Sequence, residues 1–306
     1  MKRVFLLLLA VVFVTGARAQ QDAHYSHFMY NQAGYNPAYC GIEGIINATL
    51  IYRNQWLGLD GGPKTMMLTA DMPLTVLGRQ SGAGITLESD DIGFEKNFTA
   101  KLGYAYHIQA GTGIFSVGLS AGLFNKSIDG DWQFPDEAEA VFQGKTRKMV
   151  FDLGAGLFYT VGGLSLGFSS AHLAEPVLDF SENGQTFLAR HYYFTGKYNI
   201  SLSNSLFDLT PALILMSDGN NLQFDINLNV LYNKKAWGGV TYRNGDAITF
   251  LAGLLVMGDF KVGAAYEIGL SKLRKTNAGS FELMLGYGFM PEKSKPAQKV
   301  RSVRFL

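Results

Sequence analysis

The dominant pattern along the chain is an alternation of apolar and polar residues with period two, which is typical of β-strands with one apolar face. One segment places Phe98, Leu102 and Tyr104 on one face and Lys101 and His107 on the other. Segments of this kind recur through the chain at residues 44–53, 64–72, 82–89, 96–109, 113–127, 149–160, 163–172, 190–202, 205–216, 221–232, 235–243, 247–256, 259–269 and 279–290. Their number is even, as in single-chain outer-membrane barrels.

The two faces of these segments differ in kind. One face is rich in leucine and aromatic residues, and the other carries Gly, Ser, Asn, Gln and isolated charges. The strands of a water-soluble β-sandwich also alternate apolar and polar residues. Faces this rich in leucine and aromatic residues, however, are expected to contact lipid rather than water. Beyond the first twenty residues no apolar run is long enough for a spanning helix. We therefore predict an all-β protein, a transmembrane antiparallel β-barrel of about 14 strands in a bacterial outer membrane with a polar lumen.

The lengths of the connections support this prediction. The links that follow even-numbered segments are mostly very short, as at 110–112, 161–162 and 233–234, although 73–81 is an exception. The links that follow odd-numbered segments include the long ones, among which are 128–148 and 173–189. Outer-membrane barrels have short periplasmic turns and long outer loops. We therefore expect the long connections to face outward, provided that the mature N-terminus is periplasmic.

The ends of the chain differ in composition from the barrel. Residues 1–19 have the basic, apolar and small-residue order of a secretory signal peptide. Residues 20–43 are aromatic and polar, and are interpreted as either a periplasmic segment or a plug of the lumen. The barrel is expected to span 44–290, and the basic residues of 291–306 suggest a solvated periplasmic tail.

Little in the sequence indicates chemistry. The 26 basic and 25 acidic residues nearly cancel, which disfavours a nucleic-acid partner, and one cysteine excludes an internal disulfide. The G-x-S-x-G matches at 118–122 and 163–167 lie inside strands rather than at a strand-to-helix turn. His24 and His27 lack further ligands in the sequence pattern, so packing or hydrogen bonding is the expected role of the histidines. We predict no enzymatic activity, no cofactor and no metal.

Several charged residues lie on the less apolar faces of their segments, where the lumen would receive them. We expect them to form ion pairs across the barrel interior, with substrate binding as the alternative. These lumen charges are Lys101, Asp152, Lys197, Asp225, Glu267 and Glu282.

Short sequence blocks, in their order along the chain, resemble those of a known family. They include Asn36-Pro37-Ala38, Tyr52-Arg53-Asn54-Gln55-Trp56, Ala171-His172-Leu173, Gln223-Phe224-Asp225-Ile226-Asn227, Trp237-Gly238-Gly239 and Gly279-Ser280-Phe281-Glu282-Leu283-Met284-Leu285-Gly286-Tyr287. These blocks are distributed over nearly the whole chain after residue 20. They are similar to those of the PorP/SprF family of type IX secretion, found in the outer membrane of Bacteroidota. Phe281 stands where many relatives have His, and the basic tail extends past the usual end.

The resemblance implies a non-enzymatic component of type IX secretion. It would contact outer-membrane lipids. Its protein partner would be a secreted adhesin or other cargo that it anchors, or else the periplasmic secretion and gliding machinery. An outer-membrane channel for small solutes or lipids is the alternative. The candidate structural or docking residues are Asn36, Pro37, Arg53, Asn54, Gln55 and Trp56.

Overall fold

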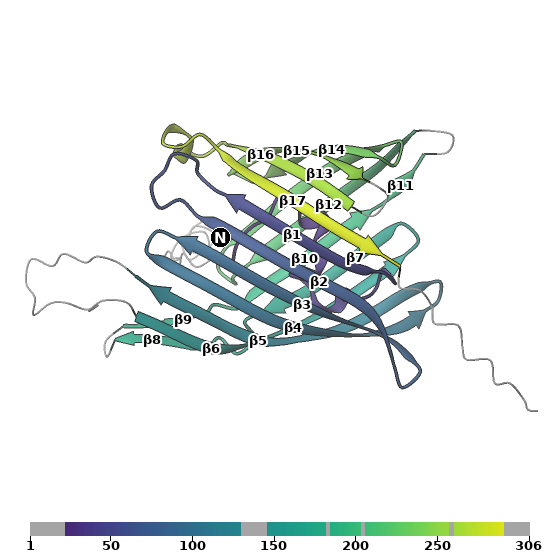
Figure 1. Ribbon diagram of the computed structural model, residues 1–306, viewed down its shortest axis with the longest axis horizontal. Coiled ribbons are helices and arrows are strands. Elements are labelled where there is room, and N and C mark those ends of the chain that lie inside the picture. Colours follow the sequence, from purple (N-terminus) through teal and green to yellow (C-terminus); the bar gives the residue numbers. More distant parts are fainter. Residues whose placement is uncertain (1–21, 130–145, 182–183, 203–205, 257–259, 291–306) are drawn as a thin grey trace, which may run out of the picture.

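The computed structural model describes residues 22–129, 146–181, 184–202, 206–256 and 260–290 (Figure 1). The expected signal peptide, the basic tail and most of the connection 128–148 lie outside the described residues. In the described parts of the chain, no helix is long and apolar enough to cross a membrane.

Fourteen antiparallel strands close into a barrel in the described part of the chain. Each strand pairs with its neighbours along the chain, and β1 pairs with β17 to complete the ring. Its strands are β1 (Ile46–Asn54), β2 (Lys64–Val76), β3 (Arg79–Ile92), β4 (Glu95–Ala110), β5 (Gly113–Ile128), β6 (Thr146–Val161), β7 (Leu164–Ala171), β10 (His191–Tyr198) with its continuation β11 (Ile200–Ser201), β12 (Phe207–Ser217), β13 (Leu222–Tyr232), β14 (Ala236–Arg243), β15 (Ala247–Val256), β16 (Phe260–Gly269) and β17 (Ser280–Phe289). The predicted all-β barrel is confirmed, with a strand in each of the fourteen predicted segments.

The alternation in the sequence separates the outside of the barrel from the lumen. Ile226 on β13 is 56% exposed, whereas Asp225 and Asn227 on either side of it are 0% and 1% exposed. Leu102 on β4 and Leu119 on β5 are likewise exposed on the outer wall. Apolar side chains therefore cover the outside, where a bilayer solvates them, and polar side chains face inward.

The connections differ at the two ends of the barrel. At one end, the turn end, strands are joined by tight turns such as Leu77-Gly78, in which both residues have positive φ (51° and 74°). The expected longer connection over 73–81 is wrong, because β2 and β3 remain paired up to Val76 and Arg79. Pro73 lies within β2, and the turn uses Leu77 where a two-residue hairpin turn usually has Asn, Asp or Gly.

The opposite end, the loop end, carries the longer connections. Residues 172–190 include a separate hairpin of β8 (Val177–Ser181) and β9 (Gly184–Phe187). Leu178 and Leu188 of this connection pack against Phe124, so the hairpin is fixed to the barrel wall. The connection 270–279 contains the 3₁₀ turn η5 (Lys272–Lys275).

Candidate functional site in the barrel lumen

Residues 22–45, called the lumen segment below, lie inside the barrel and precede β1 (Figure 1). They contain the 3₁₀ turns η1 (Phe28–Tyr30), η2 (Gln32–Gly34) and η3 (Pro37–Tyr39). The backbone N–H of Ser26 donates to Glu282 of β17 over 2.8 Å, and Ser169 of β7 donates to the Tyr35 carbonyl over 2.7 Å. Because β7 and β17 lie far apart around the ring, the segment bridges the lumen.

The lumen segment runs along the barrel from one end to the other. Asp22 contacts His172, which follows β7 at the loop end. Further on, the Gly41 N–H donates to Asp71 of β2, over 2.8 Å, in the half of β2 nearer the turn end. The chain then enters β1 at the turn end.

Apolar side chains of the lumen segment form a core with inward-facing residues of the wall. The buried members are Tyr25, Phe28, Met29 and Tyr35 from the segment, with Ile51, Met67, Tyr193, Ala212, Ile214, Met216, Trp237, Leu251, Ala265 and Met284 from the strands. Part of the lumen is therefore apolar, which differs from the polar lumen that we predicted. These residues escape water because the segment covers them.

Glycines of the wall make room for η3. A Cβ added to Gly118 of β5 would lie 2.3 Å from the Ala38 nitrogen, and one added to Gly82 of β3 would lie 1.8 Å from the Cys40 carbonyl oxygen. Both distances are too short for any side chain to fit without displacing the backbone. The wall and η3 therefore fit each other only because these positions lack a side chain.

Asn36 begins η3 and fixes it to the wall. Its side chain accepts a hydrogen bond from the Ala38 N–H over 2.9 Å, which is the bond of an N-cap residue. Its Nδ2 donates to the carbonyl of Leu157 on β6 over 2.9 Å. Pro37 follows at the first position of the turn, where its missing N–H costs no hydrogen bond.

Arg53 is the centre of a buried charge network near the loop end. Its guanidinium contacts Glu267 over 3.0 Å and Glu282 over 3.4 Å, and it donates to the Ser26 hydroxyl over 3.2 Å. Arg53 is 1% exposed, and Glu282 also lies 2.6 Å from Nδ1 of His27. The network thus joins β1, β16 and β17 to the lumen segment.

A second arginine extends this network. Arg243 of β14 contacts Glu267 over 2.7 Å and Asp225 of β13 over 3.2 Å. Asp225 lies 3.1 Å from Nε2 of His24 in the lumen segment. Asp225 and Glu282 therefore each meet an arginine on the wall and an imidazole on the segment, and Glu267 meets both arginines, as buried charges require.

Lys101 and Asp152 form a separate pair on the other side of the lumen, with Nζ and Oδ2 2.8 Å apart. The same Oδ2 lies 3.0 Å from Nδ1 of His172. Lys197, the remaining predicted lumen charge, instead lines a cavity near the turn end together with Glu43 and Lys261. The predicted lumen charges thus lie in three separate places.

The candidate docking residues are also dispersed. Asn36 and Pro37 lie in the lumen with Arg53, whereas Asn54, Gln55 and Trp56 lead from β1 into a loop-end connection. The Gln55 N–H donates to the Pro63 carbonyl over 2.8 Å, and the Trp56 N–H donates to the Ser280 hydroxyl over 3.3 Å. These residues close the rim rather than forming one patch with Asn36.

Comparison with known proteins identifies the family. The family model described as "Type IX secretion system membrane protein PorP/SprF" matches residues 17–287. The chain belongs to the PorP/SprF family. No curated protein sequence matches the chain.

Solved structures similar to this PorP/SprF chain include an outer-membrane protein and a porin. Omp33 of Acinetobacter baumannii has a TM-score of 0.47 and 7% identity over 80% of this chain and 98% of its own. A mutant porin of Rh. blastica has a TM-score of 0.35 and 11% identity over 80% of this chain and 99% of its own. The family and the closed barrel together indicate an outer-membrane location, and family membership implies contact with secretion machinery or cargo.

Sequence reasoning missed the roles of several residues in this PorP/SprF lumen. Arg243 faces Asp225 in the β13–β14 register, and its inward position could have been derived from the alternation along β14. The convergence of Asp22, His172 and His191 could not have been derived from the sequence, because it depends on how the lumen segment crosses the barrel.

Cys40 gives a direct test of how the lumen segment is enclosed. Its side chain is 3% exposed, so a reagent reaches the thiol only when the lumen segment leaves the wall. We therefore expect maleimide labelling of the folded barrel to be at least ~100-fold slower than after denaturation. Lys275→Cys, at an exposed site of η5 in a Cys40→Ser background, provides the control and should react rapidly. Equal rates at both positions would contradict the enclosed position of Cys40.

Proposed function

We propose that this PorP/SprF protein is a non-enzymatic partner of type IX export that binds and anchors a secreted surface protein, with coupling to the secretion or gliding machinery as the related possibility. The observation that carries the proposal is the lumen segment. A barrel filled by its own chain offers its two ends, rather than a pore, to other molecules.

The same observation weighs against the channel alternative. The lumen segment is linked to the wall through Glu282, Asp225 and Ser169, so a solute would have to break contacts on several sides to pass. Conducting porins instead keep a water-filled lumen. Single-channel recordings of the intact protein are expected to show no stable open level.

The loop end is the proposed partner-binding face. Its β8–β9 hairpin exposes Val177 and Phe187, and η5 exposes Leu273. Exposed apolar residues at a rim are typical of protein-binding surfaces. We take the loop end, which carries the longer connections, to be the outer face. The sequence-based expectation assumed a periplasmic N-terminus, whereas Asp22, the first described residue, lies at the loop end.

Affinity purification tests the proposal. A tagged copy is purified from detergent-solubilised outer membrane, and the proteins that stay bound are identified by mass spectrometry. Recovery of a large secreted adhesin would support anchoring, recovery of periplasmic ring or motor proteins would favour coupling to the machinery, and a solitary barrel would contradict both.

A double variant locates the binding face. We expect Val177→Ser with Phe187→Ser to reduce recovery of the partner several-fold, because both apolar contacts at the loop end are lost. Leu77→Ser at the turn end is the control, since Leu77 is an exposed apolar residue at the opposite end of the barrel, 97% exposed against 53% for Val177 and 36% for Phe187. Equal losses in both proteins would argue against the loop end.

A further inference from the structure

Two histidines and one carboxylate converge where the lumen segment begins. Asp22, His172 and His191 each offer one ligand atom, and these atoms lie within 4.8 Å of one another. Nε2 of His172 lies 3.1 Å and 3.2 Å from the two carboxylate oxygens of Asp22. The two imidazoles are almost fully buried, whereas the Asp22 side chain is 28% exposed, so an ion can reach the group from solvent.

Nε2 of His172 faces the Asp22 carboxylate, whereas the His191 ring nitrogen nearest that carboxylate is Nδ1, 3.9 Å from Oδ1. Nδ1 of His191 lies 2.9 Å from the Ala189 carbonyl, which can only accept, so Nδ1 carries the proton. Nε2 of His191 therefore keeps its lone pair, and here it accepts a long hydrogen bond of 3.4 Å from the Asp22 N–H. Nδ1 of His172 lies 3.0 Å from Asp152. A carbonyl or carboxylate behind each imidazole is the arrangement that orients histidines for a metal.

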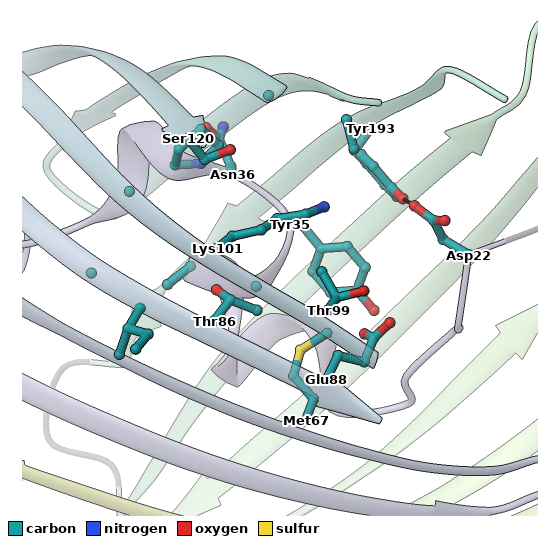
Figure 2. A pocket seen from close by; sticks show the side chains of 18 of the residues that line it. Asp22, Tyr35, Asn36, Met67, Thr86, Glu88, Thr99, Lys101, Ser120 and Tyr193 are labelled. Atoms are coloured by element: carbon teal, nitrogen blue, oxygen red, sulfur yellow. Dashed lines mark hydrogen bonds between the residues drawn. The ribbon is translucent and has the colours of Figure 1, made fainter. Parts of the chain in front are cut away.

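The charges around the group also favour a cation. Asp22 and Glu88 line one cavity of about 90 Å³, which Lys101 and Tyr193 also line (Figure 2). In Figure 2 Tyr193 points toward Asp22, to which its hydroxyl donates a hydrogen bond. Lys101 is already paired with Asp152. When both histidines are neutral, three carboxylates, those of Asp22, Glu88 and Asp152, lie near the single positive charge of Lys101.

We propose that Asp22, His172 and His191 bind a divalent transition-metal ion, Zn²⁺, which ties the start of the lumen segment to the wall beside β7 and β10. Two imidazoles and one carboxylate suit the borderline character of Zn²⁺, with a water in the cavity as the fourth ligand. Calcium takes six to eight oxygen ligands, which this group does not supply.

The competing explanation is a plain ion pair between protonated His172 and Asp22. In that case a proton provides the positive charge, and Zn²⁺ has no specific place. Zn²⁺ binding would displace this proton, so the two explanations differ in whether the folded barrel takes up the metal in a fixed ratio.

Metal titration of the full mature chain in detergent tests the proposal. The protein is stripped with a chelator, dialysed, titrated with Zn²⁺ and analysed for bound metal. We expect one Zn²⁺ per chain, and an affinity at least ~100-fold lower in Asp22→Asn and in His191→Ala. The control is His107→Ala, because His107 is an inward histidine of β4 that hydrogen-bonds Ser116 over 2.9 Å, away from the group. This variant should bind as the unchanged protein does.

Folding of each variant is checked by heat-modifiable electrophoretic mobility, so that lost binding is not confused with lost structure. Co²⁺ gives a second measurement on the unchanged protein, for which we expect the visible absorption bands of a four-coordinate nitrogen and oxygen site. Absence of stoichiometric Zn²⁺ from the folded barrel would overturn the proposal. Binding that survives Asp22→Asn and His191→Ala, which would indicate an adventitious ion only, would overturn it as well.

Discussion

Replacing Arg53 by alanine is expected to lower the free energy of unfolding of the barrel by about 3–5 kcal/mol. The substitution removes the cation that contacts both Glu267 and Glu282, and it leaves these carboxylates buried with fewer partners. Removing one partner of a buried ion pair costs more than the pair contributes, because the remaining charge stays desolvated. The change is measured as a lower denaturant midpoint, or as a lower temperature of heat modification on electrophoresis.

Arg79→Ala is the matched control for Arg53→Ala. Arg79 is an exposed arginine at the start of β3, and its removal should change the free energy of unfolding by less than about 0.5 kcal/mol. A second comparison uses Arg53→Ala combined with Glu282→Gln, which removes one of the stranded charges. The double variant should recover part of the lost stability, and equal midpoints for Arg53→Ala and Arg79→Ala would refute the central role of Arg53.

Replacing Gly118 by valine is expected to displace the lumen segment and to open an ion-conducting path. The new Cβ would lie 2.3 Å from the Ala38 nitrogen and 2.5 Å from its Cα, and backbone cannot move aside as a side chain can. The ring of strands does not depend on η3 for its own hydrogen bonds, so the barrel should persist. Planar-bilayer recordings should then show conductance steps that the unchanged protein lacks.

Gly238→Val distinguishes this effect from a general effect of β-branched residues. Gly238 lies on β14, and a Cβ there would meet only the Leu251 carbonyl oxygen, at 3.6 Å. This variant should stay closed. Conductance in both variants would point to damage of the barrel wall. Absence of conductance in Gly118→Val would show that the lumen segment moves without opening a path.

The barrel could be predicted from the sequence because lipid and lumen impose opposite demands on successive residues. The alternation at Asp225, Ile226 and Asn227 gives strand, face and lumen side without any tertiary information. The turn at Leu77-Gly78 was missed because its first residue is not one that tight turns favour, and because Pro73 resembles a strand end.

The arrangement inside the lumen could not be predicted in the same way. Residues 22–45 lack a repeating pattern, and their positions depend on contacts such as Ser26 with Glu282, which are 256 residues apart. Glycines such as Gly118 gave no sign in the sequence that they face a segment rather than water. The pairing of Lys101 with Asp152 required only strand register, but the approach of His172 to Asp22 required the path of the segment.

The continuity of the lumen segment with β1 constrains the order in which the protein assembles. The ring closes where β1 pairs with β17, and β17 also supplies Glu282 and Met284, which meet the segment. A segment attached to the first strand and held by the last one is enclosed as the ring closes, rather than threaded through a finished wall. Docking of residues 22–45 and sealing of the β1–β17 seam are therefore one coupled event in the biogenesis of this protein.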